Sequence, residues 1–281
     1  MNILAASTST TLVTLTFWTL VFLIRPATLR AQEGTTANIK HIVLGRCHSY
    51  MNFVNPTMSF DCEEIWRHFE VAVAQRSPCN ITVEHYHHMF LAMPQTWPCD
   101  RFLFWSRTRR LMRSYATVLG HFWTLEDTLA GYLFNDLVWC GRHGDLGFDF
   151  SSCPQWSACP HHPVFSLWRQ ASQNFAEVAC GNITVLLNGS IGEAFDRHSI
   201  FGSVELDSLN PERVNYVNIK VASNLGGPSV ESCEQGSIAD LIQILKFRGF
   251  RWTCTDNDPS LVILQCVQEP THPACRMCGL N

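Results

Sequence analysis

The chain has 281 residues, which suits one large domain or two modest ones, and its 46% hydrophobic against 16% charged residues excludes an intrinsically disordered protein. Its 20 Lys and Arg residues face 24 Asp and Glu residues, so the net charge of -4 leaves no broad positive surface for nucleic acid. We therefore expect a folded protein with a sizeable core and no nucleic-acid partner.

An apolar segment without charged side chains opens the chain. It spans residues 1–24 and is followed directly by Arg25 and Pro26. This pattern is typical of a secretory signal, and we predict residues 1–31 as the leader, with Ala31 as its last residue. Two alternatives stay open. The segment could be an uncleaved anchor that attaches the chain to a membrane, or a buried core helix.

Cysteines and glycosylation sequons both indicate the secretory pathway. All 13 cysteines lie beyond the leader, and so many in a chain of this size are typical of an oxidising compartment. The rival interpretation, a zinc site, needs paired short knuckles, and the only such spacing is Cys275 to Cys278. Acceptor sequons begin at Asn80, Asn182 and Asn188. We expect disulfides, N-glycans and a location that is secreted, on the cell surface or in a vesicle lumen.

Apolar spacing divides the rest of the chain into two parts. The spacing is mostly helical over residues 62–139, whereas residues 141–163 are rich in Gly, Pro, Ser and Cys, which is typical of loops. Beyond them, short β-branched runs alternate with helical segments, as in a small, mainly parallel sheet. We predict a mainly helical N-terminal domain over residues 32–160 and an α/β domain over residues 161–281.

Histidines form two clusters that could suggest a metal site. They are His85, His87 and His88 in one segment and His161 and His162 in another. No ligand spacing such as HExxH occurs, so solvated surface is the preferred interpretation. The nine tryptophans are equally ambiguous, because most tryptophans pack in cores or against cystines.

Short motifs follow one another in a distinctive order. They are FWSR from Phe104, TLEDTL from Thr124 with GYL from Gly131, LVWCG from Leu137, FAE from Phe175, NGS from Asn188 and FGSVE from Phe201. Together with the cysteine spacing, this ordered set resembles the ADP-ribosyl cyclase family of ectoenzymes, also called NAD glycohydrolases. The resemblance extends from Leu44 to Cys275.

The resemblance implies a fold and an activity. The expected fold is a helical N-terminal domain and a C-terminal domain with a parallel sheet, with the active site in the cleft between them. The expected reaction cleaves NAD into nicotinamide and either cyclic ADP-ribose or ADP-ribose, with exchange of the nicotinamide of NADP as a secondary activity. The resemblance also implies a homodimer, and a reaction that needs neither a metal nor an organic cofactor.

Four residues match the family's catalytic positions. Glu205 matches the catalytic glutamate, and the oxocarbenium-like sugar formed by cleavage of the nicotinamide bond needs such a carboxylate. Trp105 and Trp168 match the two tryptophans that line the pocket, where indole faces can stack on the nicotinamide ring. Glu126 matches the glutamate that contacts the nicotinamide amide and influences cyclisation against hydrolysis. Without the resemblance, both carboxylates would be interpreted as structural.

Further residues match positions that hold the substrate. Arg107 carries the only full positive charge among them, as a diphosphate requires. At one position, Asn135 replaces an aspartate of some relatives and keeps hydrogen bonding without charge. At another, the branched apolar Ile200 should exclude water and so favour cyclisation. The set comprises Ser106, Arg107, Asp127, Asn135, Ser172, Ile200 and Phe201.

The same resemblance implies the disulfide pairing, which spacing alone could not fix. It leaves Cys278 unpaired, either as a free thiol, in an intermolecular bond or in exchange with Cys275. The implied pairs are Cys47 with Cys62, Cys79 with Cys159, Cys99 with Cys180, Cys140 with Cys153, Cys233 with Cys254, and Cys266 with Cys275.

One competing function belongs to a different class. A receptor-like ectodomain could keep this fold, lose most catalysis and act by binding partners. The joint presence of Glu205, Trp105, Trp168 and Glu126 argues against it, because a binding module has no reason to keep these four residues together.

Overall fold

The computed structural model describes residues 34–119, 122–142 and 144–278, and side chains as far as residue 276. The predicted leader, residues 1–31, lies outside these residues, as does the side chain of Cys278. No helix in the described ranges is both long enough and apolar enough to cross a bilayer.

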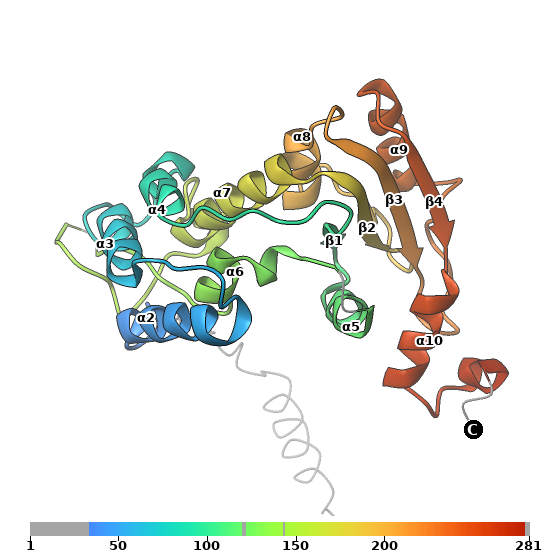
Figure 1. Ribbon diagram of the computed structural model, residues 1–281, viewed down its shortest axis with the longest axis horizontal. Helices are drawn as coiled ribbons and strands as arrows, with labels where there is room; N and C mark the ends of the chain where they lie inside the picture. Colours follow the sequence, from blue (N-terminus) through green and yellow to red (C-terminus); the bar gives the residue numbers. More distant parts are fainter. Residues whose placement is uncertain (1–33, 120–121, 143, 279–281) are drawn as a thin grey trace, which may run out of the picture. The chain divides into compact units, whose positions relative to one another are not determined.

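Helices from the first two thirds of the chain surround one hydrophobic core (Figure 1). Helix α3 shows why they form: Asp61 caps its first turn by accepting a hydrogen bond from the backbone N–H of Glu64, and its apolar residues recur at helical spacing. The fully buried Phe69 of α3 packs edge-on against Trp139. These helices are α2 (Ile39–Ser49), α3 (Cys62–Val73), α4 (His87–Leu91), α6 (Leu129–Phe134) and α7 (Pro163–Val178).

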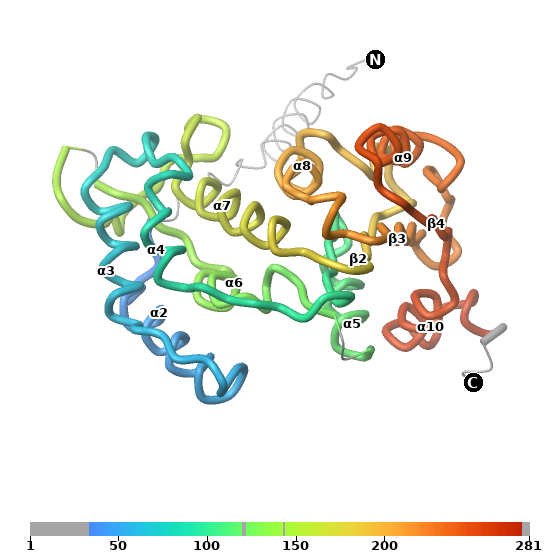
Figure 2. The backbone as a smooth tube through the Cα atoms, turned by 45° about the horizontal axis from the view of Figure 1, so that its top comes forward, coloured from blue at the N-terminus to red at the C-terminus, as the bar shows by residue number. Residues whose placement is uncertain are grey.

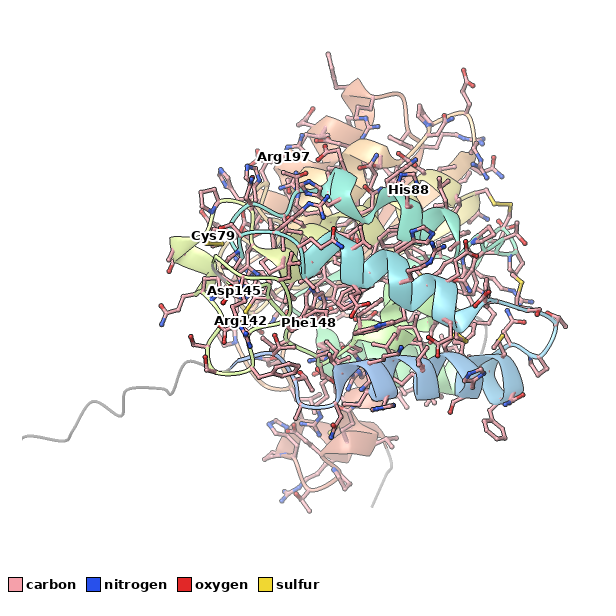
Figure 3. All side chains as sticks on the ribbon, turned by 90° about the vertical axis from the view of Figure 1, so that its left-hand side faces the viewer. Cys79, His88, Arg142, Asp145, Phe148 and Arg197 are labelled. Atoms are coloured by element: carbon pink, nitrogen blue, oxygen red, sulfur yellow. A yellow bond between two sulfur atoms is a disulfide. The ribbon has the colours of Figure 1, made fainter. Side chains whose placement is uncertain are left out.

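The loop that contains Gly147 and Phe148 packs against this helical core. Phe148 packs against Phe69 with a ring-centroid distance of 5.9 Å, and the backbone N–H of Gly147 donates to the carbonyl of Ala74. Figure 3 shows Phe148 close to Arg142 and Asp145 of the same loop, with Cys79 above them in this view. The loop thus covers the end of α3.

A parallel sheet of four strands forms the second layer, in the order β1-β2-β3-β4. Figure 2 shows α8 and α9 on one side of the sheet and α5 and α10 on the other. The strands are β1 (Leu103–Ser106), β2 (Gly181–Asn188), β3 (Val214–Ala222) and β4 (Trp252–Asp256), and the helices are α5 (Arg109–Leu119), α8 (Leu206–Ser208), α9 (Ser237–Phe247) and α10 (Pro259–Gln268). The predicted fold class, helices with a small parallel sheet, is confirmed.

The first strand comes from a part of the chain that the sequence predicted as mainly helical. β1 pairs with β2 in register from Leu103 opposite Thr184 to Ser106 opposite Leu187. Four residues are too few to show a strand period, which explains why the sequence pattern missed this strand. The domain division between residues 160 and 161 stays a prediction, and residues 103–106 belong to the sheet on the other side of it.

Six disulfides join these elements, and they are the six pairs that the family resemblance implies. They connect Cys47 with Cys62, Cys79 with Cys159, Cys99 with Cys180, Cys140 with Cys153, Cys233 with Cys254, and Cys266 with Cys275. The bond between Cys99 and Cys180 fixes the segment before β1 to the start of β2.

The Cys99–Cys180 disulfide should stabilise the fold more than the C-terminal one. It closes a loop with a sequence separation of 81, against 9 for Cys266–Cys275. Chain entropy then predicts a loss of about 4–5 kcal/mol for the Cys99→Ser/Cys180→Ser variant and about 3 kcal/mol for Cys266→Ser/Cys275→Ser. Denaturant unfolding without reductant measures both. Equal losses would contradict the loop-entropy argument.

Candidate functional site

A cavity of about 680 Å³ opens between the end of β1, helix α7 and the chain segment before α8. It brings together residues that are up to 102 positions apart, from Leu103 to Glu205. Of the sequence-predicted catalytic and substrate-binding residues, those lining it are Trp105, Ser106, Arg107, Glu126, Asn135, Trp168, Ser172, Ile200, Phe201 and Glu205.

Helix α7 supplies one wall of the cavity. Val164, Trp168, Ser172 and Phe175 line it at intervals of four, four and three residues, which places them in one stripe along the helix. Trp168 is half-buried and also packs against the helical core, so its indole is held by its neighbours. The wall is therefore apolar except for the hydroxyl of Ser172.

Glu205 ends a π-helical turn that spans Phe201–Glu205. Wide turns of this kind occur often at functional sites, because they project side chains that a regular helix would not. The turn needs Gly202, since a Cβ there would clash with the carbonyl oxygen of Asp196. Phe201 is buried beside Phe195, which fixes the start of the turn.

Glu205 is 7% exposed, and burial raises the pKa of its carboxyl from the ordinary value of 4.5 to about 8. The nearby hydroxyl of Ser172 lowers the pKa of Glu205 in part, and the negative charge of Glu126 raises it further. The Ser172 oxygen itself is buried without a hydrogen-bond partner. A carboxylate so short of partners is poised to stabilise a positive charge that enters the cavity.

Glu126 reaches the cavity from a short 3-10 turn, Leu125–Asp127. One of its carboxylate oxygens, Oε2, is buried without a hydrogen-bond partner. The turn rests directly on the start of α6, where a Cβ on Gly131 would clash with the carbonyl of Leu125 and the backbone of Glu126. The absence of a side chain at Gly131 therefore sets the position of Glu126.

Arg107 follows β1 in the left-handed backbone region, at φ 57°. Such a conformation costs a non-glycine residue energy and often marks a functional site. Here the side-chain amide of Asn188 donates to the carbonyl of Arg107 at 3.4 Å, and the guanidinium pairs with Asp196 at 3.1 Å. The arginine is thus held at the cavity wall, and its side chain is 45% exposed.

Asn135 is oriented by a residue that the sequence reading did not name. Nη2 of Arg109 donates to Oδ1 of Asn135 at 3.1 Å and pairs with Asp136 at 2.9 Å. Because Oδ1 is occupied, Asn135 presents its amide N–H₂ as the free group. Trp156, which also lines the cavity, was not singled out either, since no feature of the sequence separates it from the other tryptophans.

Asp127 is not brought into the cavity. Its carboxylate accepts hydrogen bonds from the backbone N–H of Thr124 at 2.8 Å and from the Thr124 hydroxyl at 2.9 Å, so it caps the turn that carries Glu126. A role in substrate binding through direct contact therefore has no geometric support here.

The histidine clusters do not form a metal site in the described part of the chain, where no group of three or more His, Cys, Asp or Glu residues could hold a metal ion. His85 instead caps a short turn by accepting a hydrogen bond from the backbone N–H of Thr82. His162 is buried at the start of α7, where burial lowers its pKa and its Nε2 lies 3.1 Å from the carbonyl of Pro154.

The chain is similar in sequence to a known protein family. A family model described as ADP-ribosyl cyclase matches residues 36–275. The ADP-ribosyl cyclase/cyclic ADP-ribose hydrolase 1 of Mus musculus is 40% identical over 270 residues, which cover 95% of this chain and 89% of the mouse protein.

Solved structures agree with the sequence comparison. The chain matches Aplysia cyclase complexed with substrate NGD and product cGDPR with a TM-score of 0.82 and 32% identity, over 87% of this chain and 99% of that one. It matches porcine CD38 complexed with a covalent intermediate, ribo-F-ribose-5'-phosphate, with a TM-score of 0.77 and 37% identity, over 80% and 98% of the two chains.

The close contact at Gly131 yields a test of how the Glu126 turn is held. Gly131→Ala should lower the free energy of unfolding by about 1–3 kcal/mol, because the added methyl must displace the turn. Gly45→Ala is the matched control: Gly45 lies in α2 with open space around it, so alanine there should stabilise the helix by up to about 1 kcal/mol. Thermal unfolding measures both, and a neutral Gly131→Ala would refute the contact.

Proposed function

Because this chain belongs to the ADP-ribosyl cyclase family, we propose that its cavity cleaves the nicotinamide–ribose bond of NAD and that Glu205 is the catalytic carboxylate. The products are nicotinamide and either cyclic ADP-ribose or ADP-ribose, and base exchange on NADP is a secondary activity. The observation that carries the assignment is the buried, poorly solvated carboxyl of Glu205 in a cavity walled by tryptophans.

The chemistry follows from charge. As the bond to nicotinamide breaks, positive charge moves onto the ribose, and an ionised carboxylate in a dry cavity stabilises it far better than water does. The positively charged nicotinamide ring of bound NAD also favours the ionised form of Glu205, which lowers the pKa of the carboxyl towards neutrality on binding. Burial destabilises the ionised form of Glu205, and this form gains a positively charged partner only when NAD is bound.

The aromatic walls position the leaving base. Trp105 lies in β1 and Trp168 in α7, so the two indoles reach the cavity from different elements. Each can stack on the nicotinamide ring and stabilise its charge. The free amide N–H₂ of Asn135, fixed by Arg109, can donate to the carboxamide oxygen of nicotinamide.

Arg107 is placed to bind the diphosphate. Nη2 of the guanidinium donates to Asp196 at 3.1 Å and Nη1 to the carbonyl of Glu193 at 3.4 Å, and the remaining N–H donors can bind phosphate oxygens. Ser106 precedes Arg107 in the chain and Phe201 lines the same cavity, and both can contact the ribose. We infer that no metal or organic cofactor takes part.

The remaining features concern where and how the protein acts. The cysteine content, the sequons and the apolar first segment support secretion, or attachment to a membrane through that segment. Six disulfides suit the same oxidising surroundings. We propose a homodimer as the assembly, on the family resemblance alone.

Glu205→Gln tests the assignment directly. The variant keeps the size of the side chain but cannot carry negative charge, so NAD cleavage should fall by about 10²–10³-fold or more. Chromatography separates nicotinamide, cyclic ADP-ribose and ADP-ribose after incubation of each protein, expressed from the full chain, with NAD. Glu212→Gln, at an exposed position outside the cavity, is the matched control. Parental activity in a folded Glu205→Gln protein would end the proposal, and an inactive parental protein would favour the receptor-like alternative.

The raised pKa of Glu205 predicts a pH profile. Because only the ionised carboxylate stabilises the cation, kcat/KM for NAD should rise by about tenfold per pH unit below about 8 and level off above it. The profile from pH 5.5 to 9 measures this. A profile that is flat between pH 6 and 9 would mean that Glu205 is already ionised in the free enzyme.

Ile200 should influence which acceptor captures the ribosyl cation. Its branched apolar side chain lines the cavity and excludes water, so Ile200→Thr should lower the ratio of cyclic ADP-ribose to ADP-ribose by at least about twofold. Ile200→Val keeps an apolar surface and serves as the control. An unchanged ratio in Ile200→Thr would show that this position does not decide between adenine and water.

A further inference from the structure

Part of one sheet face has no helix over it. Along β2, Ile183, Val185 and Leu187 point into the core shared with α9, so the alternate residues of the strand point to the opposite face. On that opposite face, α5 and α10 cover Leu186 near the end of β2. The face is open near the start of the strand, where Asn182 is exposed.

Asn182 lies directly beside an aromatic side chain on the neighbouring strand. Its register partner on β3 is Tyr216, and register partners in a sheet present their side chains on the same face. Tyr216 is 38% exposed, which is unusual for a tyrosine within a central strand. The side-chain amide of Asn182 makes no hydrogen bond to any described residue, whereas its backbone N–H is held by Asp100 at 2.7 Å.

Arg251 supports the tyrosine ring, which makes no second ring or cation contact with the described residues. The guanidinium carbon of Arg251 lies 4.6 Å from the ring centroid of Tyr216. Arg251 directly precedes β4, whose Trp252 pairs with Val217, so the arginine approaches the ring from the β4 side. The other face of the ring is therefore turned towards β2, where Asn182 is its neighbour.

Asn182 begins the sequon Asn182-Ile183-Thr184, and its surroundings set it apart from the other two sequons. Asn188 has its amide engaged, since Nδ2 donates to Arg107 and Oδ1 accepts from the backbone N–H of Ser190. Asn80 forms only an isolated bridge, with His161, and lies in none of the four strands of the sheet. Only at Asn182 do a free amide, an exposed strand and an open aromatic ring coincide among the three.

We propose that Asn182 carries an N-glycan whose first sugar stacks on the free face of Tyr216 and covers the open part of the sheet. The C–H groups on one face of an N-acetylglucosamine ring suit the electron-rich face of a tyrosine, which Arg251 holds in place from the other side. The glycan takes the place of a helix over this part of the sheet. This inference does not depend on the proposed NAD cleavage, because neither residue lines the catalytic cavity.

The experiment compares glycan forms of one protein expressed from the full chain in mammalian cells. Glycopeptide mass spectrometry determines whether Asn182 is modified. Endoglycosidase H, applied to protein made with high-mannose glycans, leaves the first sugar on Asn182, and Asn182→Gln removes it. We expect the trimmed protein to keep its melting temperature and Asn182→Gln to melt about 2–4 °C lower.

A double-mutant cycle assigns the effect to stacking. In the Tyr216→Ala background, Asn182→Gln should no longer lower the melting temperature, because the sugar has lost its ring. Tyr216→Thr repeats the comparison with a better strand former in case alanine prevents folding. Asn80→Gln is the control sequon, and its effect should be the same with or without Tyr216.

Either of two results would overturn the proposal. One is an unmodified Asn182 in the secreted protein. The other is a melting-temperature loss on Asn182→Gln that persists unchanged when Tyr216 is replaced. NAD cleavage is measured alongside and should not change in any of these variants, which separates this proposal from the assignment of Glu205.

Discussion

The burial of one carboxyl group, that of Glu205, is the constraint around which the site is built. Its pKa is raised from 4.5 to about 8, so its contribution to folding stability is complete below pH 4.5 and is lost as the pH rises through about 8. Ionising it in the empty cavity therefore works against the fold. The disulfides and the two packed layers supply enough folding free energy to offset the burial of this carboxylate. A cation in the cavity would stabilise the ionised carboxylate.

Two glycines let the backbone hold the carboxylates at this depth. Gly202 allows the turn that ends at Glu205 to pass against Asp196, and Gly131 allows the turn that carries Glu126 to rest on α6. In both cases a main-chain segment touches another main-chain segment, which moves less than a side-chain contact would. Precise placement of charged groups depends on such rigid supports, because a shift of about 1 Å can cost two orders of magnitude in rate.

The sequence predicted the fold class, and ten of the eleven predicted catalytic and substrate-binding residues line the cavity, because these residues lie in short, recognisable motifs. The FGSVE motif contains a whole π-helical turn, and TLEDTL contains the whole Glu126 turn with its cap. The features that were missed depend on contacts between elements, or on which of several partners a side chain takes. β1 is too short to show a period, and the hydrogen bond from Arg109 to Asn135 joins the start of α5 to the residue after α6. Asp127 was assigned to the substrate, whereas its carboxylate is used by Thr124.

The charges around the cavity suit the proposed substrate, NAD, which is anionic at its centre and cationic at one end. Arg107 and Arg109 are each paired with an aspartate, Asp196 and Asp136, so their charges are held in place and partly neutralised before substrate arrives. In the proposed binding mode, the diphosphate competes with Asp196 for the guanidinium of Arg107. Glu126 and Glu205 line the same cavity, and Oε2 of Glu126 has no hydrogen-bond partner. In the proposed reaction these two carboxyl groups act on the nicotinamide ribose, where charge develops during cleavage, so the transition state is favoured more than substrate binding.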